Sequence, residues 1–174
     1  PAPVQATYLG SLTTTAMETM GYKLTDRLLT PPDSAEWFSE EPIRLPGCFV
    51  CYQAPAGAPP VAALPASANG HVTFGSFNNL KKVTPAVVML WSRILQSVPG
   101  SKLILKDATL TDGDQRARYL ALFMNNGIEK ERIELLPRTK MPDFLSVYGR
   151  VDIGLDPFPY NGCTTTCEAL WMGV

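Results

Sequence analysis

The sequence predicts an α/β protein whose larger part is a Rossmann-like lobe built on a parallel sheet. The first observation is that short apolar runs alternate with segments of helical periodicity between residues 71 and 174. The second is that Gly, Pro, Asn and Asp residues separate these segments, where turns and helix caps are expected. Strands that alternate with helices in this way form parallel sheets with right-handed crossovers.

The strands and helices follow in order along this part of the chain. Four apolar runs are predicted strands, at residues 72–77, 102–106, 132–137 and 151–156. Thr84 and Pro85 begin the first helix, whose apolar residues recur at spacings of three and four: Val87, Leu90, Trp91, Ile94 and Val98. Asp112 begins a second helix, with the apolar residues Ala117, Leu120, Ala121 and Met124. Shorter helices are predicted over residues 141–150 and after residue 161.

The segment of residues 53–70 is rich in Ala, Pro and Gly and carries no charge, so it is predicted to be a linker. It separates a first part, residues 1–52, from the lobe at residues 71–174. No apolar run is long enough for a membrane-spanning helix, and no signal-peptide pattern is present. Because the sequence lacks an initial Met and stops directly after an apparent helix, we expect it to be a fragment of a longer protein.

Composition and charge exclude several classes of protein. The 174 residues are 45% hydrophobic and 18% charged, which is ordinary for a globular protein. Fifteen basic residues nearly balance sixteen acidic ones, so binding through bulk charge is not expected. The sequence therefore predicts neither a nucleic-acid partner nor a membrane partner.

The cysteines raise the question of a zinc site. Cys48 and Cys51 form a C-x2-C pair, and Cys163 and Cys167 form a C-x3-C pair. The first pair lies in an apparent strand and the second flanks a helix start, whereas structural zinc ligands come from short knuckles. We therefore expect free, buried thiols in a reducing cytoplasm and no metal site. The single histidine, His71, is expected in a loop.

Two polar loops follow predicted strands, at the edge where open α/β sheets bind ligands. They are FNNLKK after Phe77 and PYNGCTTT after Asp156, and we expect them to form two walls of one crevice. The second loop leads into a helix, whose free N–H groups suit a phosphate. The same threonines are suited to capping the start of a buried helix, and we expect them to cap it in the free protein and to bind phosphate in the complex, because both roles use the same N–H groups.

Side chains near these loops would complete an anion site. Gly162 permits close approach of the backbone, and Thr164, Thr165 and Thr166 add hydroxyl groups. Lys82 would supply a positive charge and Asn79 an amide N–H. Glu168 lies one helical turn beyond Thr164, where a carboxylate can accept hydrogen bonds from a ribose.

No other nucleotide-binding or hydrolase signature is present in the sequence. Asp112-Gly113-Asp114 is similar to the metal-binding D-x-D of many glycosyltransferases. Asp and Gly at a helix start with Asp in the first turn are ordinary capping, which is the favoured interpretation.

Two long segments carry a resemblance to a known family. FGSFNNLKKVTPAVVMLWSRILQSVPGSKLILK and DIGLDPFPYNGCTTTCEALWMG closely resemble the catalytic region of the O-GlcNAc transferases, in particular the bacterial SPINDLY-like branch associated with TPR repeats. The segment EWFSEEPIRLPGCFVCY resembles the end of that family's N-terminal catalytic lobe. The resemblance implies a GT-B-type glycosyltransferase fragment, with residues 1–52 ending one lobe and residues 71–174 forming an incomplete nucleotide-sugar-binding lobe.

The resemblance also implies an activity. It is transfer of N-acetylglucosamine from UDP-GlcNAc to Ser or Thr of proteins, with inversion, in the cytoplasm and without a metal cofactor. The alternatives are a fucosyltransferase that uses GDP-fucose and a non-catalytic protein that binds a sugar nucleotide or acts as a scaffold. We expect the isolated chain to be inactive, because much of the N-terminal lobe is missing from it.

The family's donor-binding residues map onto nine positions of this chain. Asn79 and Lys82 would contact the diphosphate, Thr164 and Thr165 would bind phosphate, and Glu168 would hold the ribose. The loop at Arg138 and Thr139 would face the base through its backbone, and Phe144 would either stack near the uracil or pack in the core. Cys163 stands where the family commonly has His. The predicted UDP-sugar site is therefore Asn79, Lys82, Arg138, Thr139, Phe144, Cys163, Thr164, Thr165 and Glu168.

One loop departs from the family pattern. After the first strand the family reads G-[HY]-P-G-T-[TS]-G and then Asp-Tyr, whereas this chain has GSLTTTAMETMGY. Leu12, Thr13 and Ala16 replace Pro and two Gly residues, and Gly21 replaces Asp. Because the family's loop approaches donor and acceptor, the change at residues 11–16 favours the non-catalytic alternative.

Overall fold

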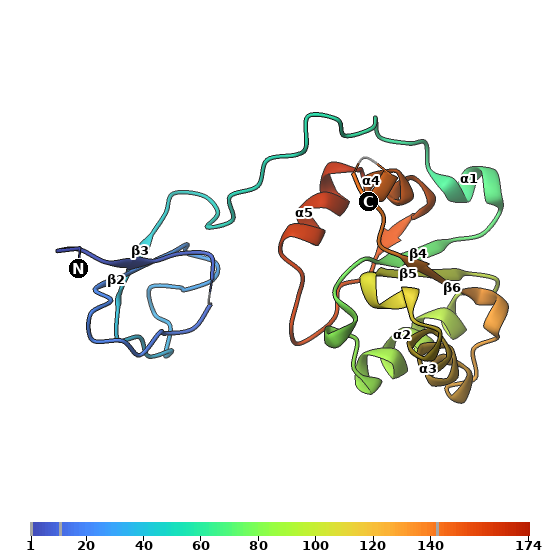
Figure 1. The fold of residues 1–174 in the computed structure, drawn as a ribbon, viewed down its shortest axis with the longest axis horizontal. Helices are drawn as coiled ribbons and strands as arrows, with labels where there is room; N and C mark the ends of the chain where they lie inside the picture. Colours follow the sequence, from blue (N-terminus) through green and yellow to red (C-terminus); the bar gives the residue numbers. More distant parts are fainter. Residues whose placement is uncertain (1, 11, 142) are drawn as a thin grey trace. The chain divides into compact units, whose positions relative to one another are not determined.

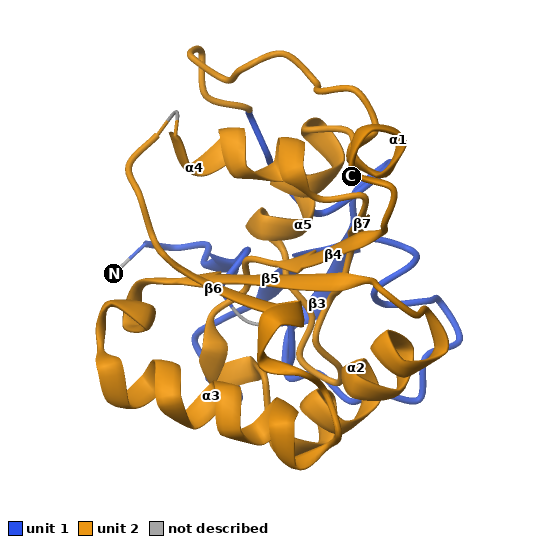
Figure 2. Cartoon of the chain, turned by 90° about the vertical axis from the view of Figure 1, so that its right-hand side faces the viewer, with its two compact units in different colours: residues 1–53 blue, residues 54–174 orange. Residues whose placement is uncertain are grey.

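The computed structural model describes residues 2–10, 12–141 and 143–174, and Ser11 of the altered loop lies outside these ranges. The chain forms two compact units, Pro1–Gln53 and Ala54–Val174 (Figures 1 and 2). The division falls one residue beyond the predicted start of the linker. The predicted linker includes a short helix, α1 (Pro65–Asn69), which begins with Pro65 and ends at Gly70 in the left-handed conformation.

The first unit contains a three-stranded parallel sheet of order β1-β2-β3. Its strands are β1 (Ala6–Thr7), β2 (Tyr22–Thr25) and β3 (Glu41–Arg44). The loop between β1 and β2 is the one that departs from the family pattern.

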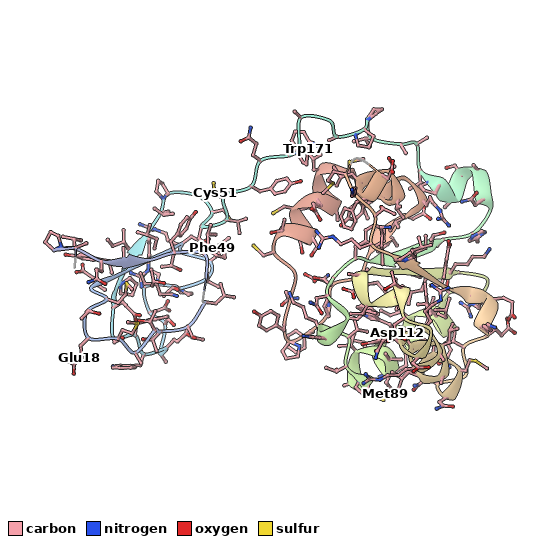
Figure 3. The ribbon with its side chains drawn as sticks, viewed as in Figure 1. Glu18, Phe49, Cys51, Met89, Asp112 and Trp171 are labelled. Carbon is pink, nitrogen blue, oxygen red and sulfur yellow. The ribbon has the colours of Figure 1, made fainter. Side chains whose placement is uncertain are left out.

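The strand expected around Cys48 and Cys51 is absent from the structure. β3 ends at Arg44, and Gly47 adopts a φ of 104°, which turns the chain out of the sheet. Cys51 follows in an irregular segment (Figure 3). All four cysteines are free, as predicted, but Cys48, Cys51 and Cys163 are exposed and Cys167 is half-buried, so the prediction of buried thiols was wrong.

The buried carboxylate of Glu40 holds the loop between β1 and β2 in place through hydrogen bonds. It accepts hydrogen bonds from the Thr14 hydroxyl at 2.7 Å, from the Thr15 backbone N–H at 2.6 Å and from the Thr15 hydroxyl. Ala16 has a φ of 55°, a left-handed conformation that glycine adopts without strain. The loop therefore keeps a glycine-type backbone at a position where the family has Gly and this chain has Ala.

These hydrogen bonds make the loop sensitive to acid. The Thr15 hydroxyl is the main cause that lowers the pKa of Glu40 from 4.5 to about 2. Because the folded pKa lies below the unfolded one, the stabilisation is complete above pH 4.5 and is lost as the pH falls through about 2. We expect the Thr15 amide resonance to titrate with a midpoint near pH 2 in NMR spectra, and this transition to vanish in Glu40→Gln. A midpoint near the ordinary glutamate value would contradict the assignment.

The second unit contains the predicted parallel sheet, with strand order β6-β5-β4-β7. Its strands are β4 (Thr73–Ser76), β5 (Lys102–Asp107), β6 (Ile133–Pro137) and β7 (Ile153–Gly154), and every neighbouring pair is parallel. The α/β class is thus confirmed. The fourth strand is shorter than predicted and pairs with β4 through two residues, Ile153 and Gly154.

The helices of this unit cover both faces of the sheet. They are α2 (Pro85–Ser97), α3 (Gly113–Asn125), α4 (Asp143–Ser146), which continues as a 3₁₀ turn (Val147–Arg150), and α5 (Thr164–Trp171). Further 3₁₀ turns are Leu80–Lys82, Ala108–Thr111 and Lys130–Arg132. Figure 2 shows α2 and α3 on one face, and α4 and α5 on the other.

The predicted caps of α2 and α3 are confirmed. Thr84 accepts a hydrogen bond from the Val87 N–H, and Asp112 accepts one from the Asp114 N–H at 2.8 Å. Figure 3 labels Asp112 at the beginning of α3. The Asp-Gly-Asp segment therefore begins a helix, as its favoured interpretation states.

The buried faces of these two helices differ in part from the prediction. On α3 the buried residues are Tyr119 and Phe123, while Met124 is 52% exposed. The predicted stripe and the observed one both have helical spacing, so periodicity does not distinguish them; the observed stripe buries two large rings. On α2, Val87 and Trp91 are buried as predicted, but Leu90 is exposed.

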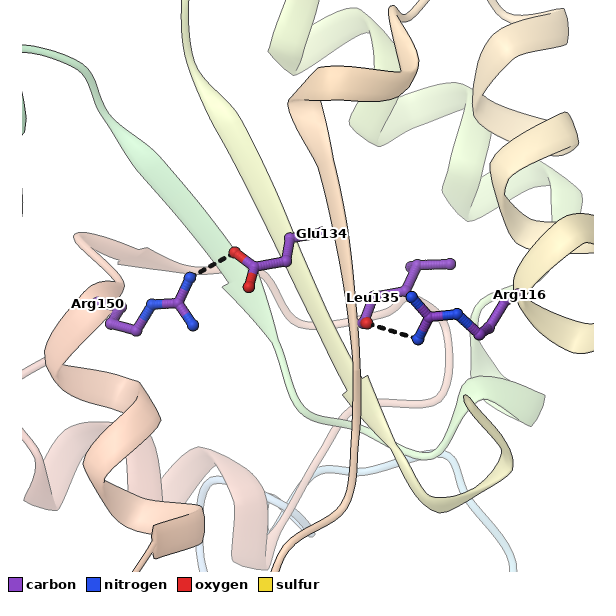
Figure 4. Close-up of polar contacts among 4 residues, drawn as sticks. All are labelled: Arg116, Glu134, Leu135 and Arg150. Atoms are coloured by element: carbon purple, nitrogen blue, oxygen red, sulfur yellow. Dashed lines mark hydrogen bonds and ion pairs between the residues drawn. The ribbon is translucent and has the colours of Figure 1, made fainter. Parts of the chain in front are cut away.

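Two apolar cores result, one on each face of the sheet. Leu103 and Leu105 of β5 face α2 and α3, whereas Ile104 between them packs with the aromatic residues of α4. Arg116 of α3 donates a hydrogen bond to the Leu135 carbonyl of β6, and Arg150 forms an ion pair with Glu134 of the same strand (Figure 4). Among the described residues, no helix has the length and apolar character that a membrane crossing requires.

Candidate functional site

The candidate site lies at the carboxyl edge of the second unit's sheet. All four strands of this sheet are parallel, so the loops that follow them open at the same edge. The loop after β4 carries Asn79 and Lys82, the loop after β6 carries Arg138 and Thr139, and the loop after β7 leads into α5. The sequence-predicted residues therefore come from three neighbouring loops and from helices that border them.

Lys82 connects the loops after β4 and β7. Its Nζ donates a hydrogen bond to the Asn161 carbonyl at 2.8 Å and lies 4.5 Å from the centre of the Tyr160 ring. The two loops that were predicted to form one crevice are thus in direct contact. The lysine charge stands beside the residues that lead into α5.

Asn79 is exposed and belongs to the same short turn as Lys82. Its Oδ1 accepts a hydrogen bond from the Lys81 N–H at 2.9 Å, which begins the 3₁₀ turn (Leu80–Lys82). The carbonyl oxygen of the amide is therefore occupied. This geometry leaves the Nδ2 group as the donor for an anion, in agreement with the predicted role, which stays a prediction.

The first turn of α5 has no side-chain cap. Cys163 occupies the N-cap position and accepts no hydrogen bond through its side chain from the backbone of the helix. The expectation that the threonines cap this helix was wrong, because two of their hydroxyls are used elsewhere: Thr165 donates to Asn78 and Thr166 to Asp156. Uncapped N–H groups at a helix start are donors for an anion.

Thr164 and Thr165 differ in what they offer a ligand. Thr164 is exposed, and its hydroxyl has no partner among the described residues. The Thr165 hydroxyl points inward and donates to the Asn78 Oδ1 at 2.9 Å. We therefore expect Thr165 to contribute its backbone N–H to a bound phosphate, whereas Thr164 contributes both its hydroxyl and its N–H.

Asn78 and Asp156 hold the loop after β7 in place, and neither was predicted as a site residue from the sequence. The Asp156 carboxylate accepts hydrogen bonds from the Gly162 N–H at 2.7 Å, the Asn78 amide at 3.1 Å and the Thr166 hydroxyl at 3.3 Å. A side chain at position 162 would collide with this cluster, since a Cβ there would lie 2.6 Å from the Asn78 Oδ1. The available signal was a polar residue at the end of each of two predicted strands: Asn78 directly follows the strand at residues 72–77, and Asp156 is the last residue of the strand at residues 151–156.

Arg138, Thr139 and Phe144 line a common hollow. Ala108, Lys140 and Met141 complete its wall. The Phe144 ring is 5% exposed and packs edge-on against Phe77 at 5.9 Å between ring centres. The structure thus places Phe144 in the core that contains Ile104 and Phe77, with its ring at the wall of the hollow. A stacking role stays a prediction.

Two cations flank the Phe144 ring. The Lys106 Nζ and the Arg138 guanidinium carbon each lie 5.8 Å from its centre. Lys106 is buried and donates to the Pro137 carbonyl at 2.7 Å, and this burial lowers the pKa of its ammonium. Of these two cations, Arg138 lines the hollow and brings a positive charge to its wall.

Glu168 is a buried carboxylate without a hydrogen-bond donor among the described residues. It is 8% exposed, and burial raises its pKa, while the charge of Arg138 opposes the shift. Buried carboxylates normally accept hydrogen bonds. The Glu168 oxygens are not among the described side-chain atoms that are both buried and unpaired, so they reach solvent, and a contact with a ribose stays a prediction.

Comparisons with known proteins show which family the chain resembles. Residues 62–174 match the profile of Glycosyl transferase family 41. The whole chain aligns with two proteins of Arabidopsis thaliana. It is 47% identical to the probable UDP-N-acetylglucosamine–peptide N-acetylglucosaminyltransferase SPINDLY and 28% identical to the one named SEC. The chain spans 19% of the first of these proteins and 18% of the second.

A solved structure is also similar. It is an O-GlcNAc transferase mutant of Thermobaculum terrenum, which matches with a TM-score of 0.90 and 38% sequence identity. The match covers 99% of this chain and 32% of that one. Both units of the present chain therefore have counterparts in one larger protein of this kind.

Proposed function

Because the chain belongs to glycosyl transferase family 41, we propose that the protein carrying it is an inverting glycosyltransferase. The donor is UDP-N-acetylglucosamine, and the acceptor is a Ser or Thr hydroxyl of a protein. The names of the two Arabidopsis thaliana relatives contain the same donor and a peptide acceptor, which supports the proposal.

One observation carries the proposal: the Lys82 ammonium is held beside the uncapped start of α5. In the transfer, the acceptor oxygen forms a bond to the anomeric carbon while the bond to the diphosphate oxygen breaks. The acceptor proton passes to a general base or to water, and negative charge grows on the departing UDP. A fixed lysine and free helix N–H groups stabilise that charge where it develops.

The test is a transfer assay on the natural protein, with radiolabelled UDP-GlcNAc and GDP-fucose offered separately to a mixed protein acceptor. We expect label from UDP-GlcNAc in protein, released by β-elimination as from Ser or Thr. Transfer from GDP-fucose alone would replace the proposed donor. Binding of UDP without any transfer would support the second candidate, a sugar-nucleotide-binding protein without transferase activity.

That second candidate is favoured by the substitutions in the loop after β1. Leu12 and Ala16 stand where the family has Pro and Gly. The left-handed φ of Ala16 and the hydrogen bonds to Glu40 support the first candidate instead, because they give this loop a glycine-type shape without the glycine. Transferase activity is therefore the preferred function.

We expect turnover to need no divalent metal. Lys82 and the α5 N–H groups supply positive charge at the proposed diphosphate site, and the Asp112 carboxylate is already used in capping α3. EDTA should leave the transfer rate of the natural protein within about twofold. Loss of activity in EDTA that Mg²⁺ or Mn²⁺ restores would overturn this expectation.

The proposed setting is the cytoplasm. All four cysteines are free thiols, which is typical of a reducing compartment. The partners that we propose are the nucleotide sugar and the protein acceptor, and the balanced charge of the chain gives no reason to add nucleic acid or a membrane.

A further inference from the structure

Tyr160 holds a position that none of the functions described above explains. It lies in the loop after β7, it is 70% exposed, and its ring belongs to neither apolar core. Among the described residues, the polar group that contacts the ring is the Lys82 ammonium, 4.5 Å from the ring centre. An aromatic ring this exposed adds little to the stability of the fold, so its contact with a cation is the feature that calls for a function.

The partners of Lys82 are both electrically neutral. The Asn161 carbonyl accepts its hydrogen bond at 2.8 Å, and the Tyr160 ring presents its negative face. Among the described residues Arg150 forms an ion pair with Glu134 (Figure 4), and no carboxylate pairs with Lys82. The lysine is therefore oriented without losing its charge to an acidic partner.

This arrangement has a consequence for binding. A free lysine side chain loses rotamer entropy when it binds a ligand, and an ordered one has already lost it. A carboxylate would order the lysine too, but it would compete with the ligand's phosphate. A carbonyl and a ring order the side chain and leave two of its three N–H donors for other acceptors.

We propose that Tyr160 is a positioning residue for Lys82 in the binding of the donor diphosphate. Its ring and the Asn161 carbonyl keep the ammonium beside the start of α5 before the nucleotide arrives. The inference rests on the proposed function, because it assumes that Lys82 binds the diphosphate.

The test compares UDP binding to the natural protein and to four variants by calorimetry. Tyr160→Leu removes the ring's electrostatic face but keeps an apolar side chain, and its Kd for UDP should rise about three- to tenfold. Tyr160→Phe keeps the face and should restore a Kd within about twofold of the natural protein. In a Lys82→Met background, Tyr160→Leu should cause no further loss, because the ring then has no cation to hold.

The possible outcomes distinguish failure of the Tyr160 positioning role from failure of the diphosphate site at Lys82. A natural Kd in Tyr160→Leu, together with weak binding by Lys82→Met, would overturn the positioning role and leave the diphosphate site standing. An equal loss from Tyr160→Leu with and without Lys82 would also overturn it, because the ring would then act on the ligand or the loop directly. A natural Kd in Lys82→Met would remove the proposed diphosphate site itself.

Discussion

Replacing Lys82 by methionine should weaken UDP binding by a factor of about 10 to 150. This range corresponds to about 1.5–3 kcal/mol, the contribution of a hydrogen bond to a charged group. Methionine keeps the length and much of the apolar stem of lysine but has no charge. The loss should appear in the Kd for UDP measured by calorimetry, with the thermal stability of the protein nearly unchanged, because the Lys82 ammonium is bonded to one backbone carbonyl.

Lys81 provides a matched control for this change. It is the neighbouring lysine in the same 3₁₀ turn and is exposed. Lys81→Met removes the same charge from the same turn, so it reports any general electrostatic effect on UDP. Equal losses in the two variants would mean that bulk charge near the loop matters and that Lys82 has no specific contact with the diphosphate.

Replacing Asp156 by alanine should loosen the loop after β7 by about 3 kcal/mol. The substitution leaves the Gly162 N–H, the Asn78 amide and the Thr166 hydroxyl without their common acceptor. Each lost hydrogen bond to a charged group is worth about 1.5–3 kcal/mol, and the half-buried position of Asp156 and the coupling of the three bonds reduce the sum. Hydrogen exchange of residues 157–171 measures this local free energy of opening.

Asp114→Ala is the control for Asp156→Ala. Asp114 is an exposed aspartate in the first turn of α3, and no described residue donates a hydrogen bond to its side chain. Its removal should change local exchange by less than about 1 kcal/mol, the limit of a helix-dipole effect. If Asp156→Ala left exchange in residues 157–171 as slow as in the natural protein, the hydrogen-bonded cluster would not be what holds the loop.

The alternation of strands and helices, and with it the parallel sheet, could be predicted because the signals that begin and end each element are local in the sequence. Thr84 and Asp112 are caps that precede periodic apolar residues, and both begin helices in the structure. The choice of buried face on α3 could not be made in the same way. Two stripes with the same spacing compete there, and only the packing of Tyr119 and Phe123 against the sheet decides between them.

The proximity of Lys82 and the start of α5 could be predicted from the sequence, because both follow strands of a parallel sheet, and the structure places them together. The residues that hold these loops in place were missed. Asn78 and Asp156 are far apart in the sequence, and the 3.1 Å contact between their side chains exists only after β4 and β7 pair. That contact also explains the wrong expectation for the threonine caps, because Thr165 and Thr166 donate to this cluster and not to their own helix.

The left-handed backbone at Ala16 bears on how this loop can change in evolution. Its shape depends on Thr14, Thr15 and Glu40, which together hold a conformation that costs alanine about 1 kcal/mol. Residue 16 can then be either alanine or glycine, as long as the hydrogen bonds of Thr14 and Thr15 to Glu40 are kept. Natural variants that lack Glu40 should be those in which residue 16 is glycine, a correlated pair that sequencing of close homologues would reveal.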